Sequence, residues 1–221
     1  MARPHSAAVT LEKILAAARA EFAQNGFDGA RLDAIAKAAG VTKQLVYHYY
    51  KSKEELYGVV LDLISRDSHI MLDSSDYDDC TPPEAIALLV TRIMQSFRER
   101  PYLAGMMLDQ DLHQGEHITR RSQYIPTVRK FVNARMIPIV DRGVAEGFFR
   151  PGIDPFMLYW TLFTLATSVF TQAWAMIESC GTDFTCDEMI DRWRTHVVTL
   201  VLQGIAAHPD PFAGSPQERP A

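Results

Sequence analysis

Apolar residues recur along most of this chain at the three- and four-residue spacing of an amphipathic helix. The first such stripe runs through Leu11, Ile14, Leu15, Ala18 and Phe22. No stretch alternates apolar and polar residues with the period of two that marks a half-buried strand. The pattern therefore predicts an all-α protein.

Three short helices are predicted in the N-terminal part of the chain. Thr10 is a candidate N-cap of the first, and Asn25-Gly26 should end it, because both residues tolerate the left-handed conformation of many helix termini. A second helix is predicted over 31–38 and a third over 43–50, with Thr42 as its N-cap. Two short helices joined by a tight turn that contains glycine form a helix-turn-helix, whose second helix enters the major groove of DNA.

The rest of the chain is predicted to form six longer helices. They are expected over 52–72, 83–99, 101–113, 117–146, 155–178 and from about 185 onward. The helix over 117–146 should be interrupted near Pro126 and bent near Pro138, because proline cannot donate a backbone hydrogen bond. The predicted organisation is a disordered arm over 1–9, a helix-turn-helix domain over 10–52, a second domain over 53–207 and a disordered tail over 208–221.

Charge is unevenly distributed between these two parts. The whole chain has a net charge of -5, which is not typical of a nucleic-acid binder. Residues 1–55 carry eight Lys or Arg against six Asp or Glu, a net charge of +2, and residues 56–221 carry fourteen against twenty-one, a net charge of -7. The basic surplus lies in the helix-turn-helix segment, but it is too small to indicate DNA binding by itself.

The cellular compartment is indicated by the cysteines and by the absence of an apolar signal segment at the N-terminus. Cys80, Cys180 and Cys186 have no metal-like spacing, so we expect a reduced, cytoplasmic protein. Residues 156–177 carry no charge and are long enough to span a bilayer. Six of them are Thr, Ser or Gln, and no Lys or Arg cluster flanks them, so we favour a helix buried on two sides over a membrane span.

The third helix carries a dense group of aromatic residues among lysines. Val46 and Tyr50 lie four residues apart and should pack inward. The side chains expected to point outward are Lys43, Gln44, Tyr47 and His48. Lysine and glutamine can bond to purine edges, and tyrosine and histidine can touch thymine methyls or phosphates. Lys53, at the start of the next helix, could hold a phosphate together with the helix N-terminus. An ordinary amphipathic helix pair has a similar pattern, so spacing alone leaves DNA binding open.

Residues 21–61 resemble the N-terminal domain of TetR-family transcriptional regulators. The matching motifs are F-x-x-x-G-F, I-A-x-x-A-G-V and Y-x-Y-Y-x-S-K-E-E-L. The resemblance implies DNA-facing positions at Lys43, Gln44, Leu45, Tyr47 and His48, and phosphate-contacting positions at Thr42, Tyr49 and Lys53. Ala30 stands where a Ser or Thr cap is frequent, which loses a bond worth about 1 kcal/mol, although Arg31 could reach a phosphate. Gln44 stands where a small residue is frequent.

The same resemblance implies a homodimer in which the last two long helices of each subunit form a four-helix interface. Helix 155–178 is apolar on more faces than one core can use. A two-fold dimer would cover these faces and match a two-fold DNA site. The residues assigned to the interface are Trp160, Phe163, Phe170, Trp193 and Val197. The alternative is a central helix in a monomeric bundle.

A small-molecule pocket in the second domain is also implied by the resemblance. Residues 83–146 are rich in flexible apolar side chains, which adapt to varied ligands, although such a stripe is also typical of an ordinary core. The candidate pocket residues are Met94, Phe97, Met106, Met107, His113, Tyr124, Phe131, Arg135 and Trp174. The run LDQDLHQGEHI, with the connector and helix that follow, distantly resembles the second domain of regulators of pyrimidine use of the RutR type.

The remaining candidate chemistry is a group of carboxylates and imidazoles within nine residues. It comprises Asp109, Asp111, His113, Glu116 and His117. These residue types can bind a metal, but we favour a solvated loop and predict no metal site. No Ser/His/Asp order or Gly-rich phosphate loop is present, so we expect neither an enzyme nor a cofactor.

The predicted function is a ligand-responsive repressor. It would bind a palindromic double-stranded operator as a homodimer, away from any membrane, and a small-molecule effector would release it. An activator of the same fold, or an all-α metal-dependent enzyme, is the alternative.

Overall fold

The computed structural model describes residues 4–72, 75–115 and 124–207, a few of them beside the gaps in backbone alone. These residues form helices joined by turns, and their one pairing of extended backbone is an isolated bridge between Phe149 and Ala206. The prediction of an all-α fold is therefore confirmed.

The N-terminal domain consists of α1 (Pro4–Gly29), α2 (Leu32–Ala39) and α3 (Lys43–Tyr49). Because α1 begins at Pro4, the predicted N-cap at Thr10 is wrong, and residues 4–9 are helical where a disordered arm was expected. At the other end, Gly26 leaves the helical region with φ 66°, as Asn25-Gly26 predicts, but a further turn follows before the helix ends.

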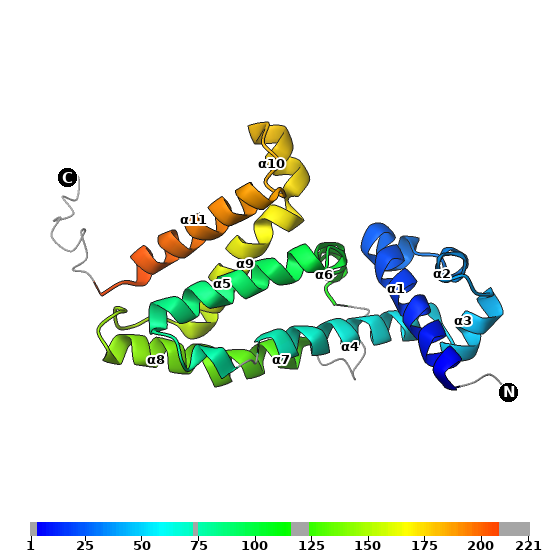
Figure 1. Cartoon of the computed structure of the whole chain (residues 1–221), viewed down its shortest axis with the longest axis horizontal. Coiled ribbons are helices and arrows are strands. Elements are labelled where there is room, and N and C mark those ends of the chain that lie inside the picture. Colours follow the sequence, from blue (N-terminus) through cyan, green and yellow to red (C-terminus); the bar gives the residue numbers. More distant parts are fainter. Residues whose placement is uncertain (1–3, 73–74, 116–123, 208–221) are drawn as a thin grey trace, which may run out of the picture.

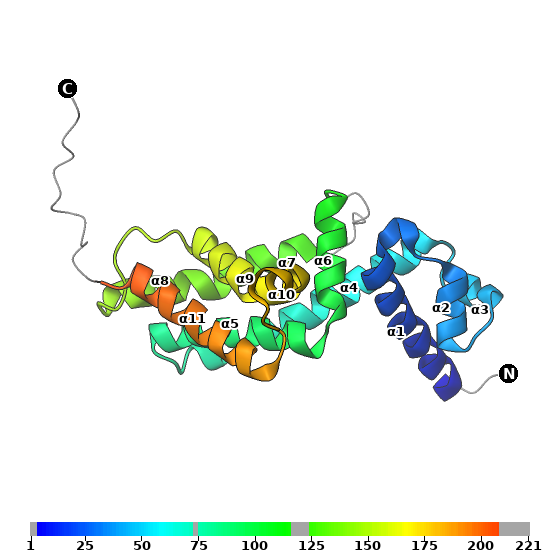
Figure 2. The same ribbon diagram turned by 90° about the horizontal axis from the view of Figure 1, so that it is seen from above.

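Helix α4 (Lys53–Leu72) runs from the N-terminal domain into the second domain (Figure 1). The helices of the second domain are α5 (Pro82–Glu99), α6 (Tyr102–Leu112), α7 (Tyr124–Phe131), α8 (Ile137–Ala145), α9 (Pro155–Thr171), α10 (Ala173–Cys180) and α11 (Asp187–Ile205). Helix α5 lies against α8, α9 and α11, and its Ile86, Leu89 and Val90 are completely buried. Both views place α6 beside α1, so α6 connects the two domains (Figures 1 and 2).

Two predicted long helices are interrupted in the structure. The described part of 117–146 is α7 and α8 joined by a π-helical turn, Val132–Met136. This wider turn accommodates Pro138, whose ring would clash with the carbonyl four residues earlier in an α-helix. The predicted helix over 155–178 is two helices, because the chain leaves helical geometry at Gln172.

The apolar segment over 155–178 is broken after its first helix. Helix α9 has 17 residues and ends at Thr171. Within the described residues, no helix combines the length and the apolar composition needed to cross a bilayer.

Candidate functional site

The two faces of α3 differ as the sequence predicts. Val46 is completely buried and Tyr50 is 7% exposed, because both pack into the core formed by α1 and α2. Four side chains on the other face are exposed to solvent: Lys43, Gln44, Tyr47 and His48. Leu45 and Tyr49 are half-buried between the two faces. The helix therefore presents a polar and aromatic surface on a rigid apolar base.

The starts of α2 and α3 are capped in different ways. The Thr42 hydroxyl accepts a hydrogen bond from the Leu45 backbone N–H at 3.2 Å, which confirms Thr42 as an N-cap. Helix α2 has no side-chain cap, as Ala30 predicts. Instead, the Arg31 backbone N–H donates to the Glu21 carboxylate of α1 at 3.0 Å. This leaves the Arg31 side chain exposed and available to a partner.

Lys43, which was assigned to DNA binding, also contacts two side chains of its own domain. Its Nζ lies 3.0 Å from the Asp33 carboxylate of α2 and 6.0 Å from the centre of the Tyr47 ring. Both partners of the ion pair are about half exposed, so the pair contributes little to stability. Lys43 can therefore exchange Asp33 for a phosphate or a base without a large cost.

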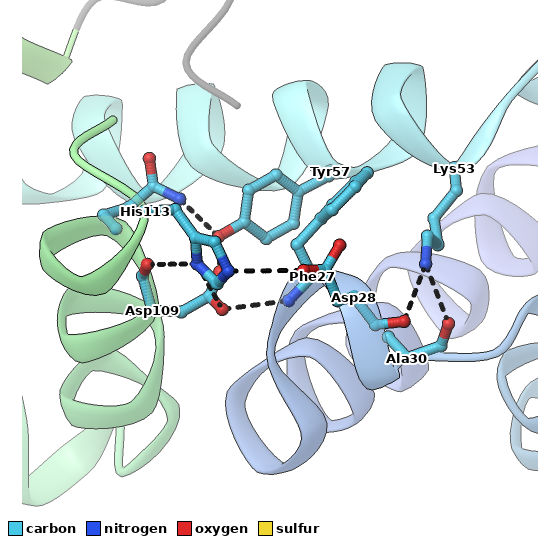
Figure 3. A network of polar contacts seen from close by, with 8 residues as sticks. Phe27, Asp28, Ala30, Lys53, Tyr57, Asp109 and His113 are labelled. Carbon is cyan, nitrogen blue, oxygen red and sulfur yellow. Dashed lines mark hydrogen bonds and ion pairs between the residues drawn. The ribbon is translucent and has the colours of Figure 1, made fainter. Parts of the chain in front are cut away.

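Lys53 holds the end of α1 against the start of α4 (Figure 3). Its Nζ donates to the carbonyl oxygens of Asp28 and Ala30, both at 3.2 Å, and lies 4.6 Å from the centre of the Phe27 ring. Two of the three ammonium donors are thus used within the protein. Phosphate binding by Lys53 stays a prediction.

Sequence reasoning missed a polar network that joins the two domains, drawn in Figure 3. The Asp109 carboxylate of α6 is buried and accepts the Phe27 backbone N–H at 3.0 Å, while its other oxygen accepts the Tyr57 hydroxyl of α4. Gln110 donates to the same hydroxyl. Burial, and then the hydrogen bond to Asp109, raise the pKa of Tyr57, which stays protonated.

His113 extends this network at the end of α6. Its Nδ1 lies 2.8 Å from the Asp109 carbonyl oxygen and 3.3 Å from the Asp109 carboxylate, and its Nε2 lies 3.4 Å from Asp28. The hydrogen bond to the carbonyl, followed by the two negative charges, raises the pKa of His113. His113, predicted to line the ligand pocket, thus belongs to the domain junction.

Metal binding by the Asp/His group receives no support from the described part of the chain. Glu116 and His117 lie outside the described residues. Among the residues that are described, no three His, Cys, Asp or Glu side chains are close enough together to hold a metal ion. Asp109 and His113 instead bond to protein groups.

The predicted pocket residues whose side chains the structure describes do not all gather around one site. Met94, Phe97, Met106 and Phe131 are buried, which agrees equally with the alternative of an ordinary core. Four others are dispersed: Met107 is half-buried, His113 is at the junction, Arg135 pairs with Asp78 at 3.2 Å, and Trp174 is 77% exposed. The side chain of Tyr124 lies outside the described part. The break at Gln172 turns Trp174 away from the core, so its assignment to an enclosed pocket is wrong for the protomer.

Helices α9 and α11 carry exposed apolar side chains that bear on dimerisation. Met157 is 72% exposed and Trp160 51% exposed on α9, beside an open groove of about 630 Å³, and Leu200 is 51% exposed on α11. Trp193 is half-buried, and its indole N–H donates to the Leu165 carbonyl at 2.9 Å.

The other assigned interface residues pack within the protomer. Phe163 and Phe170 are half-buried, and their rings lie 6.1 and 5.8 Å from that of Phe97. Val197 is 1% exposed, so its assignment to the interface is wrong, because it faces α5 and α9 in the core. The spacing of apolar residues in the sequence did not show which face of α11 packs against the core and which face is exposed.

Comparison with protein-family models assigns both parts of the chain. Residues 14–60 match the model of bacterial regulatory proteins of the tetR family, and residues 82–201 match a tetracyclin repressor-like C-terminal domain. This chain belongs to the TetR family. The first match covers the helix-turn-helix and the start of α4, and the second covers α5 to α11 in large part. The resemblance found in the sequence, and the helix-turn-helix domain followed by a helical domain, are therefore confirmed.

Several HTH-type transcriptional regulators are similar to the chain. The transcriptional repressor NicS of Pseudomonas putida is 27% identical over 208 residues, covering 92% of this chain and 95% of NicS. The repressor KstR2 of Mycobacterium tuberculosis is 26% identical over 151 residues, covering 66% and 72%. RutR of Escherichia coli is 50% identical, but over 58 residues that cover 25% of this chain and 27% of RutR. A match of that length cannot cover the second domain, so the RutR-type likeness of that domain stays a prediction.

Solved structures of transcriptional regulators share the fold. The regulator SCO4942 of Streptomyces coelicolor superposes with a TM-score of 0.66 at 23% identity, covering 89% of this chain and 98% of that one. FadR of Bacillus subtilis in complex with stearoyl-CoA superposes with a TM-score of 0.65 at 21% identity, covering 88% and 99%. At these identities the likeness concerns the fold alone.

Proposed function

We propose that this TetR-family protein is a ligand-responsive transcriptional repressor that binds a palindromic operator as a cytoplasmic homodimer. The observation that carries the proposal is that α3 exposes polar and aromatic side chains on one face, while Val46 and Tyr50 anchor its opposite face in the core. Similar proteins of the family, NicS and KstR2, are named transcriptional repressors, which supports repression over activation or catalysis. An activator of the same fold would use the same surface at a different operator position.

The residues assigned to DNA binding divide into two roles. Lys43, Gln44, Tyr47 and His48 of α3 face the base edges in the major groove, where lysine and glutamine can distinguish bases. Phosphate contacts, which fix the register of that helix on the duplex, are assigned to Arg31 before α2, Thr42 before α3, Tyr49 at the end of α3 and Lys53 at the start of α4. Leu45, half-buried on α3, offers an apolar contact to a thymine methyl.

Dimerisation would use the exposed apolar face of α9 and α11. This face exposes three large apolar side chains, those of Met157, Trp160 and Leu200. Exposed apolar patches mark interaction sites or cause aggregation. A two-fold dimer covers both copies of this face and places two α3 helices about 34–36 Å apart, one helical turn of DNA, or a multiple of it.

Small-molecule binding in the second domain would change this separation, and a coupling of about 1–3 kcal/mol weakens operator binding 5- to 150-fold. A protein with this fold, FadR of Bacillus subtilis, binds stearoyl-CoA, which supports the proposal that this chain also binds a small-molecule effector.

The test is a gel-shift titration with duplexes selected by the protein from a random pool. Replacing Lys43→Ala and Tyr47→Ala together should weaken specific binding at least about tenfold, since each good base contact is worth about 1–3 kcal/mol. The matched control is Lys130→Ala with Phe148→Ala, which removes an exposed cation and an exposed ring from the second domain. Unchanged binding by the α3 variant would refute the assigned reading helix.

The dimer is tested on the same material by light scattering. Trp160→Glu places a charge in the centre of the proposed interface and should convert dimers to monomers, because buried aromatic residues at interface centres each contribute about 2 kcal/mol or more. Val197→Thr, at a buried position, should leave the oligomeric state unchanged. A wild-type protein that is monomeric at all concentrations would contradict the proposal.

A further inference from the structure

Helices α1 and α6 approach each other more closely than side chains normally permit. A β-carbon added at Gly105 of α6 would lie 2.1 Å from the Ala23 carbonyl oxygen of α1. That neighbour is backbone and cannot rotate away. The two domains therefore touch backbone to backbone here, which leaves little freedom for α1 to slide along α6.

One turn further along α6, a carboxylate is bonded to the kink in α1. Gly26 has φ 66°, so the chain leaves the helix there and the next backbone N–H, that of Phe27, points toward α6. Asp109 accepts this N–H at 3.0 Å, and a β-carbon at Gly26 would lie 2.5 Å from the same carboxylate oxygen. The glycine thus provides both the kink and the space for the carboxylate.

The same carboxylate also fixes α4. The second oxygen of Asp109 accepts the Tyr57 hydroxyl, and the Tyr57 ring packs edge-on against the rings of Phe22 and Phe27, with ring centres 4.7 and 5.1 Å away. One turn earlier on α4, Lys53 holds the Asp28 and Ala30 carbonyls, which lead into α2 (Figure 3). Three helices from two domains therefore meet at one buried group.

Burying a carboxylate costs hydration free energy, which a purely structural contact could avoid. An apolar side chain of similar size would fill the space without loss of hydration. Hydrogen bonds, however, are directional and fix orientation as well as distance, and both carboxylate oxygens of Asp109 accept one. The bonds of Asp109 therefore suit a junction whose angle matters.

We propose that Asp109 is a positioning residue for operator binding: its bonds to Phe27 and Tyr57 fix the angle between the helix-turn-helix domain and the second domain. In the dimer this angle sets the separation of the two α3 helices. The consequence for DNA rests on the proposed function, whereas the fixed angle is a property of the single chain.

Two substitutions remove bonds with little change of shape. Asp109→Asn has one acceptor oxygen in place of two. If that oxygen keeps the Phe27 N–H, the Tyr57 hydroxyl loses its acceptor, and the new amide N–H can only donate to an oxygen that already accepts from Gln110. Tyr57→Phe removes the hydroxyl and keeps the ring packed against Phe22 and Phe27. The matched control is Tyr77→Phe, which removes the hydroxyl of another buried tyrosine, packed against Phe131 and Arg92 in the second domain.

The first measurement needs no DNA. Spin labels are placed at Gln44 of α3 and Gln95 of α5, both exposed, in a full chain whose three cysteines are replaced by serine. Labelled chains are diluted with unlabelled protein so that distances within one subunit dominate. We expect a narrow distance distribution for the parent and Tyr77→Phe, and a broadened or shifted one for Asp109→Asn and Tyr57→Phe. Distributions as narrow as the parent's in both junction variants would overturn the proposal.

The second measurement uses the duplex selected by the wild-type protein, with the spacing between its half-sites lengthened or shortened by one or two base pairs. Wild type and Tyr77→Phe should prefer one spacing, and the junction variants should lose at least half of that preference while keeping their non-specific affinity at low salt. A preference that is fully retained would refute the role in operator binding. If the wild-type protein selects no duplex at all, the proposed function fails, and the distance measurement still decides whether Asp109 fixes the angle.

Discussion

Polar side chains are used in opposite ways on the outer face of α3 and at the junction of α1 with α6. On α3, Tyr47 is 46% exposed and its polar neighbours face solvent, with Lys43 held by one exposed ion pair. On α6, Asp109 and Gln110 are 7% and 6% exposed, and both bond to Tyr57. The first arrangement leaves hydrogen-bonding capacity for a partner, and the second uses it to hold two domains in one orientation.

This difference predicts how each region responds to substitution. A change on the face of α3 should alter DNA affinity with little effect on folding, because exposed side chains far from special features contribute within about 0.5 kcal/mol. A change at the junction should alter both, since buried groups left without partners cost about 1–3 kcal/mol each. Thermal unfolding and operator binding, measured on the same variants, separate the two cases.

The largest effect on stability is expected at Gly105. Gly105→Ala places a methyl group 2.1 Å from the Ala23 carbonyl oxygen, so α1 and α6 must separate. Overpacking of this kind costs about 1–3 kcal/mol, which corresponds to a fall in Tm of roughly 2–12 °C for a chain of this size. Calorimetry measures this change directly.

The matched control is Gly204→Ala in α11. A β-carbon at Gly204 meets no atom within 4 Å, so the substitution adds a methyl group without overlap. Because alanine favours the helix over glycine by up to about 1 kcal/mol, Tm should stay the same or rise slightly. If both variants lower Tm equally, the close approach at Gly105 does not limit the junction.

The contrast also explains what sequence reasoning could reach. The α3 face was predictable because its signal is local: Val46 and Tyr50 lie four residues apart on one helix, and the motif around Tyr47 is specific to a family. The Asp109–Phe27 bond joins residues 82 positions apart, and no periodicity reports such a pair. Asp109 therefore stood out in the sequence only as one member of a possible metal cluster.

The errors in the second domain have a similar origin. Val197 is buried and Trp174 exposed, contrary to their assigned roles, because the orientation of α10 and α11 depends on the break at Gln172 and on packing against α5 and α9. The composition of helix 155–178 indicated its apolar character but not where it would turn. Fold class thus followed from local pattern, whereas pocket and interface residues depended on long-range packing.

A smaller effect is expected from the titration of His113. Its pKa is raised in the folded protein by the Asp109 carbonyl and by the charges of Asp109 and Asp28. Stability gained from the protonated imidazole is therefore complete below the unfolded-state pKa, about 6.5, and is lost as the pH rises through the higher folded-state pKa. The Tm of wild type should exceed that of His113→Gln by more at about pH 6 than at about pH 8. An equal difference at both pH values would show that the ring acts by packing alone.

The smallest effect on stability is expected at Asp33. Its substitution tests whether the exposed side chains of α3 are free to bind DNA, as their exposure indicates. Asp33→Asn frees Lys43 from its ion pair and removes a negative charge beside the DNA-facing surface. Operator affinity should rise a few-fold at about 50 mM salt and less at about 200 mM, because the added attraction is electrostatic. Stability should fall by about 1 kcal/mol or less, since an exposed pair and an acidic residue in the first turn of α2 are lost.

Fluorescence anisotropy with labelled operator measures this change, and Asp141→Asn on α8 is the control with the same change of charge at an exposed position far from α3. A similar gain in the control would mean that net charge, and not the release of Lys43, is responsible. Weaker binding by Asp33→Asn would mean that the ion pair orients Lys43 for DNA. In that case the polar contacts on α3, like those on α6, would serve to position side chains, and the two regions would differ only in exposure.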